Sequence, residues 1–340
     1  MRDRDNAIDV ARGLAIILVI IGHLNTNFTQ FIYSFHMPLF FVVSGMTFSN
    51  YCENMKISHF IGKRIRKLIV PYYLWEMIYV PFEIGNIGNL VYGSRKSIMA
   101  ISGYGPLWFL PCLFISNFLF FCILHAVCYI KPGGGRCALL FGIVTILVLM
   151  GCFLAKTAEY YSLPCNLDTA LVSMVYVYIG WLLSNIKKRH STMRSSMSAA
   201  LFIVIMIILV VTYNENLPRS EYGTEYVACA FSVYGNFLWF YFNGIIGSLG
   251  VIILSSIMVN NLILKEGFTH IGRHTLTILA THVEIIDFTK TVFEKYSLEV
   301  WLPAKVFIIL AICVIFSSLL DVIIKRYVPC LNGTNGIFLS

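Results

Sequence analysis

Long apolar stretches recur along the whole chain and limit what it can fold into. Examples are 139–154, 199–211 and 307–320, and no polar region of domain size lies between such runs. The chain is 58% hydrophobic and 12% charged, whereas a soluble domain carries about 25% charged residues. A water-soluble fold of this length could not bury so much apolar surface. The sequence therefore predicts one all-α, polytopic membrane domain.

About ten membrane-spanning helices fit this pattern, because a helix needs about 20 residues to cross the hydrocarbon core. Their predicted limits are 7–26, 30–49, 68–90, 105–129, 137–156, 167–186, 197–214, 228–259, 272–289 and 301–325. Acidic residues interrupt the third and ninth spans, at Glu76, Glu83, Glu284 and Asp287. The eighth span is long enough to be tilted or broken, and Gly244, Gly247 and Gly250 would permit a break.

Lysine and arginine gather in alternate loops, which sets the expected orientation. Most of the 25 basic residues lie at the two ends of the chain or in the loops 56–67, 131–136, 187–194 and 265–273. Short cytoplasmic loops carry such an excess, so both termini are predicted to be cytoplasmic. The net charge of +8 is thereby explained without a nucleic-acid partner. The ten cysteines form no CxxC pair, and most are interpreted as small apolar residues.

The first predicted span carries three ionisable residues, Asp9, Arg12 and His23. Each costs at least about 2.5–3.5 kcal/mol to insert, so each needs a partner, a water path or a function. Asp9 and Arg12 are three residues apart and can pair. Arg12 and His23 are eleven residues apart, which returns a helix to nearly the same direction about 16 Å further along. The three residues predict a polar stripe, although a buried structural pair and an interfacial histidine remain alternatives.

A second histidine precedes the next apolar run, in Phe35-His36-Met37-Pro38-Leu39-Phe40-Phe41. Pro38 fits a helix start, so His36 is expected just before the helix and at a depth similar to that of His23. Either histidine could act as a base near neutral pH.

A basic cluster lies just before the third span, at Lys63-Arg64-Ile65-Arg66-Lys67. Arg64 and Lys67 are expected on one helix face. The cluster could contribute only to membrane orientation, or it could bind the phosphates of a nucleotide-like donor.

Other candidate residues are more isolated in the sequence. His282 lies inside the ninth predicted span, where it could have a catalytic or acceptor-binding role. Glu76 lies inside the third, where it could line a cavity or pair with a neighbouring helix. Trp108 is expected near the outer boundary, where it could belong to an aromatic belt or stack on a sugar. No metal-ligand spacing is present, so no metal is expected.

Several of these segments resemble the acyltransferase-3 family of membrane acyltransferases. Ile8-Asp9-Val10-Ala11-Arg12-Gly13 with His23 is similar to its Arg-x10-His signature, and Arg64 with Lys67 to its Arg-x2-Arg motif, with lysine in the second position. The run 35–45 and Gly105-Pro106-Leu107-Trp108-Phe109-Leu110-Pro111 resemble the branch related to fucose O-acetylases. Ile271-Gly272-Arg273-His274-Thr275-Leu276 and His282 resemble the late helix of the family.

The resemblance implies an integral membrane O-acyltransferase that moves an acyl group, most often acetyl, from cytoplasmic acetyl-CoA or another acyl-CoA to a carbohydrate hydroxyl. The acceptor would belong to an exopolysaccharide, O-antigen, capsule or peptidoglycan precursor, and the protein to the bacterial inner membrane. His23, His36 and Asp9 are the catalytic candidates. Arg12, Lys63, Arg64 and Lys67 are the donor-binding candidates, and His282, Trp108 and Glu76 the acceptor-binding candidates.

Residues 1–328 are expected to form the membrane acyltransferase domain, and 329–340 a short cytoplasmic tail. Two other classes fit a helical bundle with intramembrane charge. A transporter or flippase of a lipid-linked sugar is the first alternative, although the sequence has no evident inverted repeat. A membrane sensor acting with a partner protein is the second.

Overall fold

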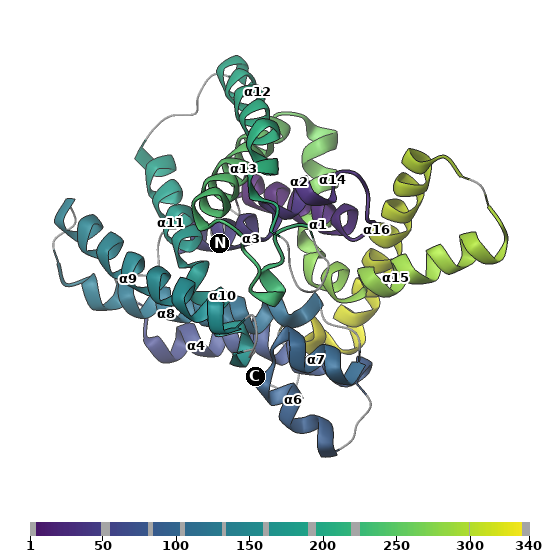
Figure 1. Ribbon diagram of the computed structural model, residues 1–340, viewed down its shortest axis with the longest axis horizontal. Coiled ribbons are helices and arrows are strands. Elements are labelled where there is room, and N and C mark those ends of the chain that lie inside the picture. Colours follow the sequence, from purple (N-terminus) through teal and green to yellow (C-terminus); the bar gives the residue numbers. More distant parts are fainter. Residues whose placement is uncertain are drawn as a thin grey trace. The chain divides into compact units, whose positions relative to one another are not determined.

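The computed structural model describes residues 5–48, 55–80, 84–102, 106–130, 134–158, 163–189, 195–218, 225–298 and 300–334. Over these residues the protein is helical, with one isolated β-bridge between Ala228 and Val233. Figure 1 shows these helices with their labels. The chain forms two compact units. Unit 1 contains 1–36, 193–227 and 238–332, and unit 2 contains 37–192, 228–237 and 333–340.

Unit 1 brings the first helix of the chain together with its last helices. Its helices are α1 (Asn6–Gly22), α2 (Thr29–Tyr33), α12 (Ser195–Thr212), α13 (Phe237–Met258), α14 (Leu262–Arg273), α15 (Thr275–Lys295) and α16 (Leu302–Tyr327). The short turns η5 (Tyr213–Asn216) and η7 (Pro329–Asn332) complete it. Asp5 caps α1 by accepting a 3.1 Å hydrogen bond from the Ala7 amide, which satisfies a backbone donor at the helix start.

Unit 2 contains most of the middle of the chain. Its helices are α3 (His36–Met46), α4 (Ile57–Arg64), α5 (Val70–Tyr79), α6 (Ile87–Tyr92), α7 (Arg95–Ser102), α8 (Phe109–Val127), α9 (Gly134–Ala158), α10 (Leu167–Val172) and α11 (Met174–Arg189). Its short segments are η1 (Ile65–Ile69), η2 (Ile84–Asn86), η3 (Pro106–Trp108), η4 (Pro164–Asn166) and η6 (Cys229–Phe231). A methyl group on Gly180 would lie 2.0 Å from the Val42 carbonyl oxygen, so α3 and α11 pack backbone to backbone.

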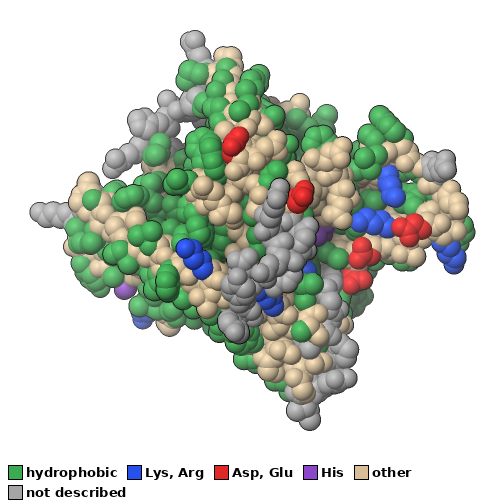
Figure 2. Space-filling model, viewed as in Figure 1, with side chains coloured by type: hydrophobic (Ala, Val, Ile, Leu, Met, Phe, Trp, Pro, Cys, Tyr) green, Lys and Arg blue, Asp and Glu red, His purple; other side chains and the backbone are tan. Residues whose placement is uncertain are grey.

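Five helical segments of the described chain are long and apolar enough to cross a membrane. They are 106–127, 134–157, 196–216, 237–258 and 302–327, and a pair bent by 55°, 164–172 with 174–186, gives a sixth if it counts as one span. Large apolar side chains on α9, α12 and α16 are exposed, and Figure 2 shows hydrophobic side chains over much of one face, with few charged ones. These surfaces suit contact with lipid, so the protein is a multi-pass membrane protein.

Several predicted spans differ from the observed helices. The span predicted at 30–49 is divided into α2 and α3, and α3 begins at His36 itself, with Pro38 in its first turn. The span predicted at 68–90 is not one helix, because α5 ends at Tyr79 and α6 begins at Ile87. Glu83 lies outside the described residues. By helix length and composition, the described residues therefore give five or six candidate spans, and the predicted count of ten is not confirmed.

The eighth predicted span begins later than expected and is not broken at its glycines. α13 runs without interruption from Phe237 to Met258. A methyl group on Gly247 would lie 2.3 Å from the Phe35 ring, and one on Gly250 would lie 3.0 Å from Ile205. These two glycines therefore allow close approach of neighbouring side chains within unit 1, rather than a helix break.

Candidate functional site

An ion-pair group lies near the start of α1. The predicted pair is confirmed, since Arg12 Nη1 lies 3.2 Å from Asp9 Oδ1. Arg273, the last residue of α14, adds a second cation with its Nε 3.8 Å from Asp9 Oδ2. Asp9 is buried, whereas the two arginine side chains are 33% and 48% exposed. The carboxylate thus holds two guanidinium groups that can still reach a ligand.

A basic cavity adjoins this group and was not predicted from the sequence. It has a volume of about 260 Å³ and is lined by Asn6, Lys265, Glu266, Thr269, His270 and Arg273. Two permanent cations and a histidine against one carboxylate suit an anionic ligand, and guanidinium groups match phosphate geometry. The signal in the sequence is the basic loop 265–273, with Lys265, His270 and Arg273.

Three histidines lie at the other end of α1, in its C-terminal cap and in the helices nearby. His23 caps α1, His36 begins α3, and His282 lies in α15. The His23 and His282 rings are in edge-to-face contact, with centroids 4.9 Å apart. Tyr33 contacts both of the others, with centroid distances of 4.6 Å to His36 and 6.2 Å to His23. All four residues belong to unit 1, because the boundary between the units falls after His36, the first residue of α3. The structure therefore brings the two predicted catalytic histidines and His282 into one cluster.

Backbone carbonyls define the tautomer of each ring. Nδ1 of His23 lies 2.9 Å from the Val19 oxygen, and Nδ1 of His36 lies 3.0 Å from the Ile32 oxygen. Nδ1 of His282 lies 2.9 Å from the Leu279 oxygen. A carbonyl oxygen only accepts, so Nδ1 carries the hydrogen in each neutral ring and Nε2 carries the lone pair. Each Nε2 is therefore suited to accept a proton or to attack a carbonyl carbon.

His282 is the most enclosed of the three histidines. Its side chain is fully buried, and its Nε2 has no hydrogen-bond partner within the described part of the chain. A buried polar atom without a partner is uncommon and points to a ligand or a reacting group.

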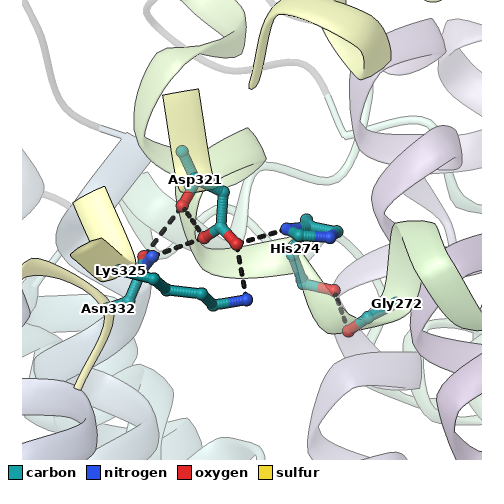
Figure 3. Close-up of polar contacts among 7 residues, drawn as sticks. Gly272, His274, Asp321, Lys325 and Asn332 are labelled. Atoms are coloured by element: carbon teal, nitrogen blue, oxygen red, sulfur yellow. Dashed lines mark hydrogen bonds and ion pairs between the residues drawn. The ribbon is translucent and has the colours of Figure 1, made fainter. Parts of the chain in front are cut away.

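A buried polar cluster holds together the helices that carry this site (Figure 3). Asp321 of α16 accepts a hydrogen bond from His274, pairs with Lys325 at 2.5 Å, and contacts Thr277 at 2.7 Å. Asn332 in η7 also donates to Asp321, so the first residues of the expected tail pack against α15 and α16. Because His274 and Thr277 flank the start of α15, the cluster fixes the helix that bears His282. Asp321 was missed in the sequence, although a single carboxylate in the apolar run of α16 is the signal that would have revealed it.

The remaining predicted site residues lie in unit 2. Arg64 Nη2 donates to Thr47 Oγ1 at 3.2 Å, and its guanidinium lies 5.2 Å from the Phe48 ring centroid. Lys67 lies in η1, a π-helical turn. The expected common face of Arg64 and Lys67 assumed α-helical spacing, and a π turn spaces residues differently. Lys63 precedes them in the last turn of α4.

The two predicted acceptor-binding residues of unit 2 are both buried. Glu76 in α5 is fully buried, and neither carboxylate oxygen has a hydrogen-bond partner within the described residues. Trp108 is 7% exposed and packs edge-on against the Phe109 ring. Among the described residues, no group of three or more His, Cys, Asp and Glu side chains is placed to hold a metal ion.

The fold and these groups define a multi-pass membrane protein with a basic cavity and a histidine cluster. The sequence matches the family described as "Acyltransferase domain" over residues 5–320. The chain therefore belongs to the acyltransferase-3 family, and it is an acyltransferase.

Two relatives share shorter regions. The chain is 29% identical over 136 residues to the nodulation protein NolL of Mesorhizobium japonicum, a match that covers 34% of this chain and 35% of that protein. It is 34% identical over 86 residues to NolL of Sinorhizobium fredii, covering 22% of this chain and 24% of that protein. The chain thus spans about a third and about a quarter of the lengths of these relatives.

Proposed function

We propose that the protein is an integral membrane O-acyltransferase that transfers an acyl group, acetyl in the simplest case, from cytoplasmic acyl-CoA to a carbohydrate hydroxyl. The observation that carries this proposal is that α1 has a charged group near its start and a histidine cluster at its end, all within unit 1. The helix has 17 residues, or about 25 Å at 1.5 Å per residue. Asp9, Arg12 and Arg273 lie near its start and the histidine cluster at its end. One helix thus joins an anion-binding group to a histidine cluster about 16–21 Å away, which is about half to two thirds of the thickness of a hydrocarbon core.

The donor is proposed to bind at the start of α1. Arg12 and Arg273 are exposed enough to contact its phosphates, and the cavity lined by Lys265 and His270 would hold part of the nucleotide. Charge-assisted hydrogen bonds from guanidinium groups to phosphate are strong and directional. Lys63, Arg64 and Lys67 of unit 2 are kept as further donor-binding candidates.

His23 is proposed as the base. Its Nε2 would take the proton of the acceptor hydroxyl while that oxygen attacks the thioester carbonyl carbon. The C–S bond then breaks, and the CoA thiolate leaves and is protonated. In a second route, His23 Nε2 itself attacks the thioester, carries the acyl group, and passes it to the hydroxyl. Both routes release CoA and form one ester.

The other residues are assigned supporting roles. Asp9 positions the two arginines, and His36 and His282 lie where they can exchange a proton with His23 or bind the acceptor. Trp108 and Glu76 are kept as acceptor-binding candidates.

The proposed topology has about ten spans, with both termini in the cytoplasm of a bacterium and the domain 1–328 in its inner membrane. The acceptor would be an extracytoplasmic or lipid-linked carbohydrate of an exopolysaccharide, O-antigen or capsule.

A His23→Ala variant tests the proposal. The purified protein in nanodiscs would be given acetyl-CoA, and acetyl transfer to glycans would be followed by mass spectrometry. His23→Ala should lose about 100-fold or more of the transfer rate, as expected for loss of a general base. His59→Ala, which removes an exposed histidine in α4, should retain it. Near-normal transfer by a well-folded His23→Ala protein would refute this role and assign the base to His36 or His282, each replaced separately.

A further inference from the structure

A polar cleft lies beside the histidine cluster, in unit 1. It has a volume of about 610 Å³ and is lined by Asn25, Thr26, Asn27, Gln30, Glu225 and Tyr226, with the buried Thr29 completing the lining. Asn25 and Asn27 are exposed to solvent, as is Glu225. The cleft therefore presents hydrogen-bonding side chains to an incoming molecule.

The cleft is connected to the histidines by the backbone and by aromatic rings. α1 ends at Gly22, His23 is its C-cap, and Asn25 adopts a left-handed backbone conformation with φ of 51°. Asparagine is among the residues that tolerate this conformation. The cleft lining thus begins two residues after His23.

On the other side, the Tyr226 ring lies 4.4 Å from that of Tyr33, centroid to centroid. Tyr33 is the ring that contacts both His23 and His36. A ligand against Tyr226 would therefore lie next to the tyrosine that borders the proposed base.

The chemistry of the lining indicates what would bind. Asparagine and glutamine amides each offer a donor and an acceptor, which matches the hydroxyl groups of a sugar. A tyrosine ring offers an apolar face together with a polar tip. Glu225 is the one charged group among the described lining residues. Its carboxylate accepts hydrogen bonds from hydroxyl groups and repels an anion.

We propose that this cleft is the acceptor site, that it binds a carbohydrate through Asn25, Asn27, Gln30 and Tyr226, and that Glu225 selects an uncharged sugar over a uronic acid. The inference rests on the proposed function and adds the location and charge preference of the acceptor. The hydroxyl to be acylated would project from the cleft toward Tyr33 and His23.

Paired glycans test the charge preference directly. Galactan, glucan and mannan fragments would be compared with galacturonan, glucuronan and mannuronan fragments of the same length. Binding to the full-length protein in nanodiscs would be measured by saturation-transfer NMR without donor, and transfer would be measured with acetyl-CoA. At least one neutral fragment should bind about fivefold or more tightly than its acidic partner, the effect of one nearby like charge. Glu225→Gln should reduce this ratio.

Side-chain variants test the location. Asn27→Ala and Tyr226→Ala should raise the KM for the neutral acceptor about tenfold, while the KM for acetyl-CoA changes less than about twofold. Thr291→Ala, an exposed position on α15 of the same unit, is the control and should change neither KM.

Equal binding of neutral and acidic fragments would overturn the charge preference. Unchanged acceptor KM in the Asn27 and Tyr226 variants would overturn the location, and binding by none of the neutral fragments would overturn the ligand class. Failure of the proposed function has a different signature, because the wild-type protein would then neither transfer nor hydrolyse the acetyl group of acetyl-CoA. The NMR comparison would still decide whether the cleft binds sugar.

Discussion

Gly13 of α1 and Gly272 of α14 pack against each other with no room for a side chain. A methyl group on Gly13 would lie 2.3 Å from the Phe268 carbonyl oxygen, and one on Gly272 would lie 2.0 Å from the Asp9 carbonyl oxygen. The two backbones therefore touch directly, as small residues permit where two helices pack closely. This contact places Arg273 beside Asp9.

Gly272→Ala is expected to lower both stability and activity. The added methyl group would collide with backbone atoms that cannot rotate away, so α1 and α14 would have to separate. Gly267→Ala in the same helix is the matched control, because a methyl group there meets nothing within 4 Å, and alanine favours the helix over glycine. Thermal unfolding of both variants would be compared. A Gly272→Ala protein as stable as Gly267→Ala would contradict the contact.

Arg273→Gln and Arg12→Gln are expected to raise the KM for acetyl-CoA about tenfold or more, since each removes a guanidinium that can contact phosphate. The same variants should use S-acetylpantetheine, which has no nucleotide phosphates, nearly as well as the wild-type protein does. Lys295→Gln, at the end of α15, serves as the charge-matched control. An equal loss with both donors would show that the arginines support structure and not phosphate binding.

His270 is expected to make donor binding depend on pH. Burial lowers the pKa of His270 below its usual value, and His274 and Lys325 add to this effect, with Asp321 opposing it. The imidazole is therefore neutral at pH 7 and gains its charge only as the pH falls through the lowered pKa. That charge would strengthen phosphate binding, so the KM for acetyl-CoA should decrease toward acidic pH. His270→Gln should flatten the plot of the KM for acetyl-CoA against pH. The same pH dependence in this variant would exclude His270 as its source.

Reporter fusions after Lys188 and after Asn216 are expected to lie on opposite sides of the membrane. α12 is a single candidate span of 196–216 and separates the two points. The fusion after Lys188 should be cytoplasmic, because the basic loop 187–194 favours that side. The same location for both fusions would show that α12 does not cross the membrane.

The sequence predicted local relationships better than distant ones. The pairing of Asp9 with Arg12 follows from helical spacing, so it could be predicted and is confirmed. The approach of Arg273 to Asp9 depends on two glycines far apart in the chain, and spacing alone gives no such information. The contact between His23 and His282 likewise joins residues far apart in the chain.

Helix breaks were also difficult to predict from the sequence. Apolar length predicted one helix over 68–90, yet α5 ends at Tyr79, directly before Val80-Pro81. A residue before proline is biased toward extended backbone, and Val80 is extended, with ψ of 125°. In α13, the glycines suggested a break but serve as contact surfaces, and the sequence alone does not distinguish these uses.

The discontinuous make-up of unit 1 has a consequence for biosynthesis. Asp9 and Arg12 leave the ribosome first, but Arg273 and His282 follow only when most of the chain has been made. In the proposed topology, the first helix enters the membrane before its long-range partners exist, with only the local ion pair to offset its charges. Catalytic competence would then arise at the end of translation, when α14 and α15 join a helix inserted much earlier. A truncated chain could accordingly be inserted and abundant while remaining inactive.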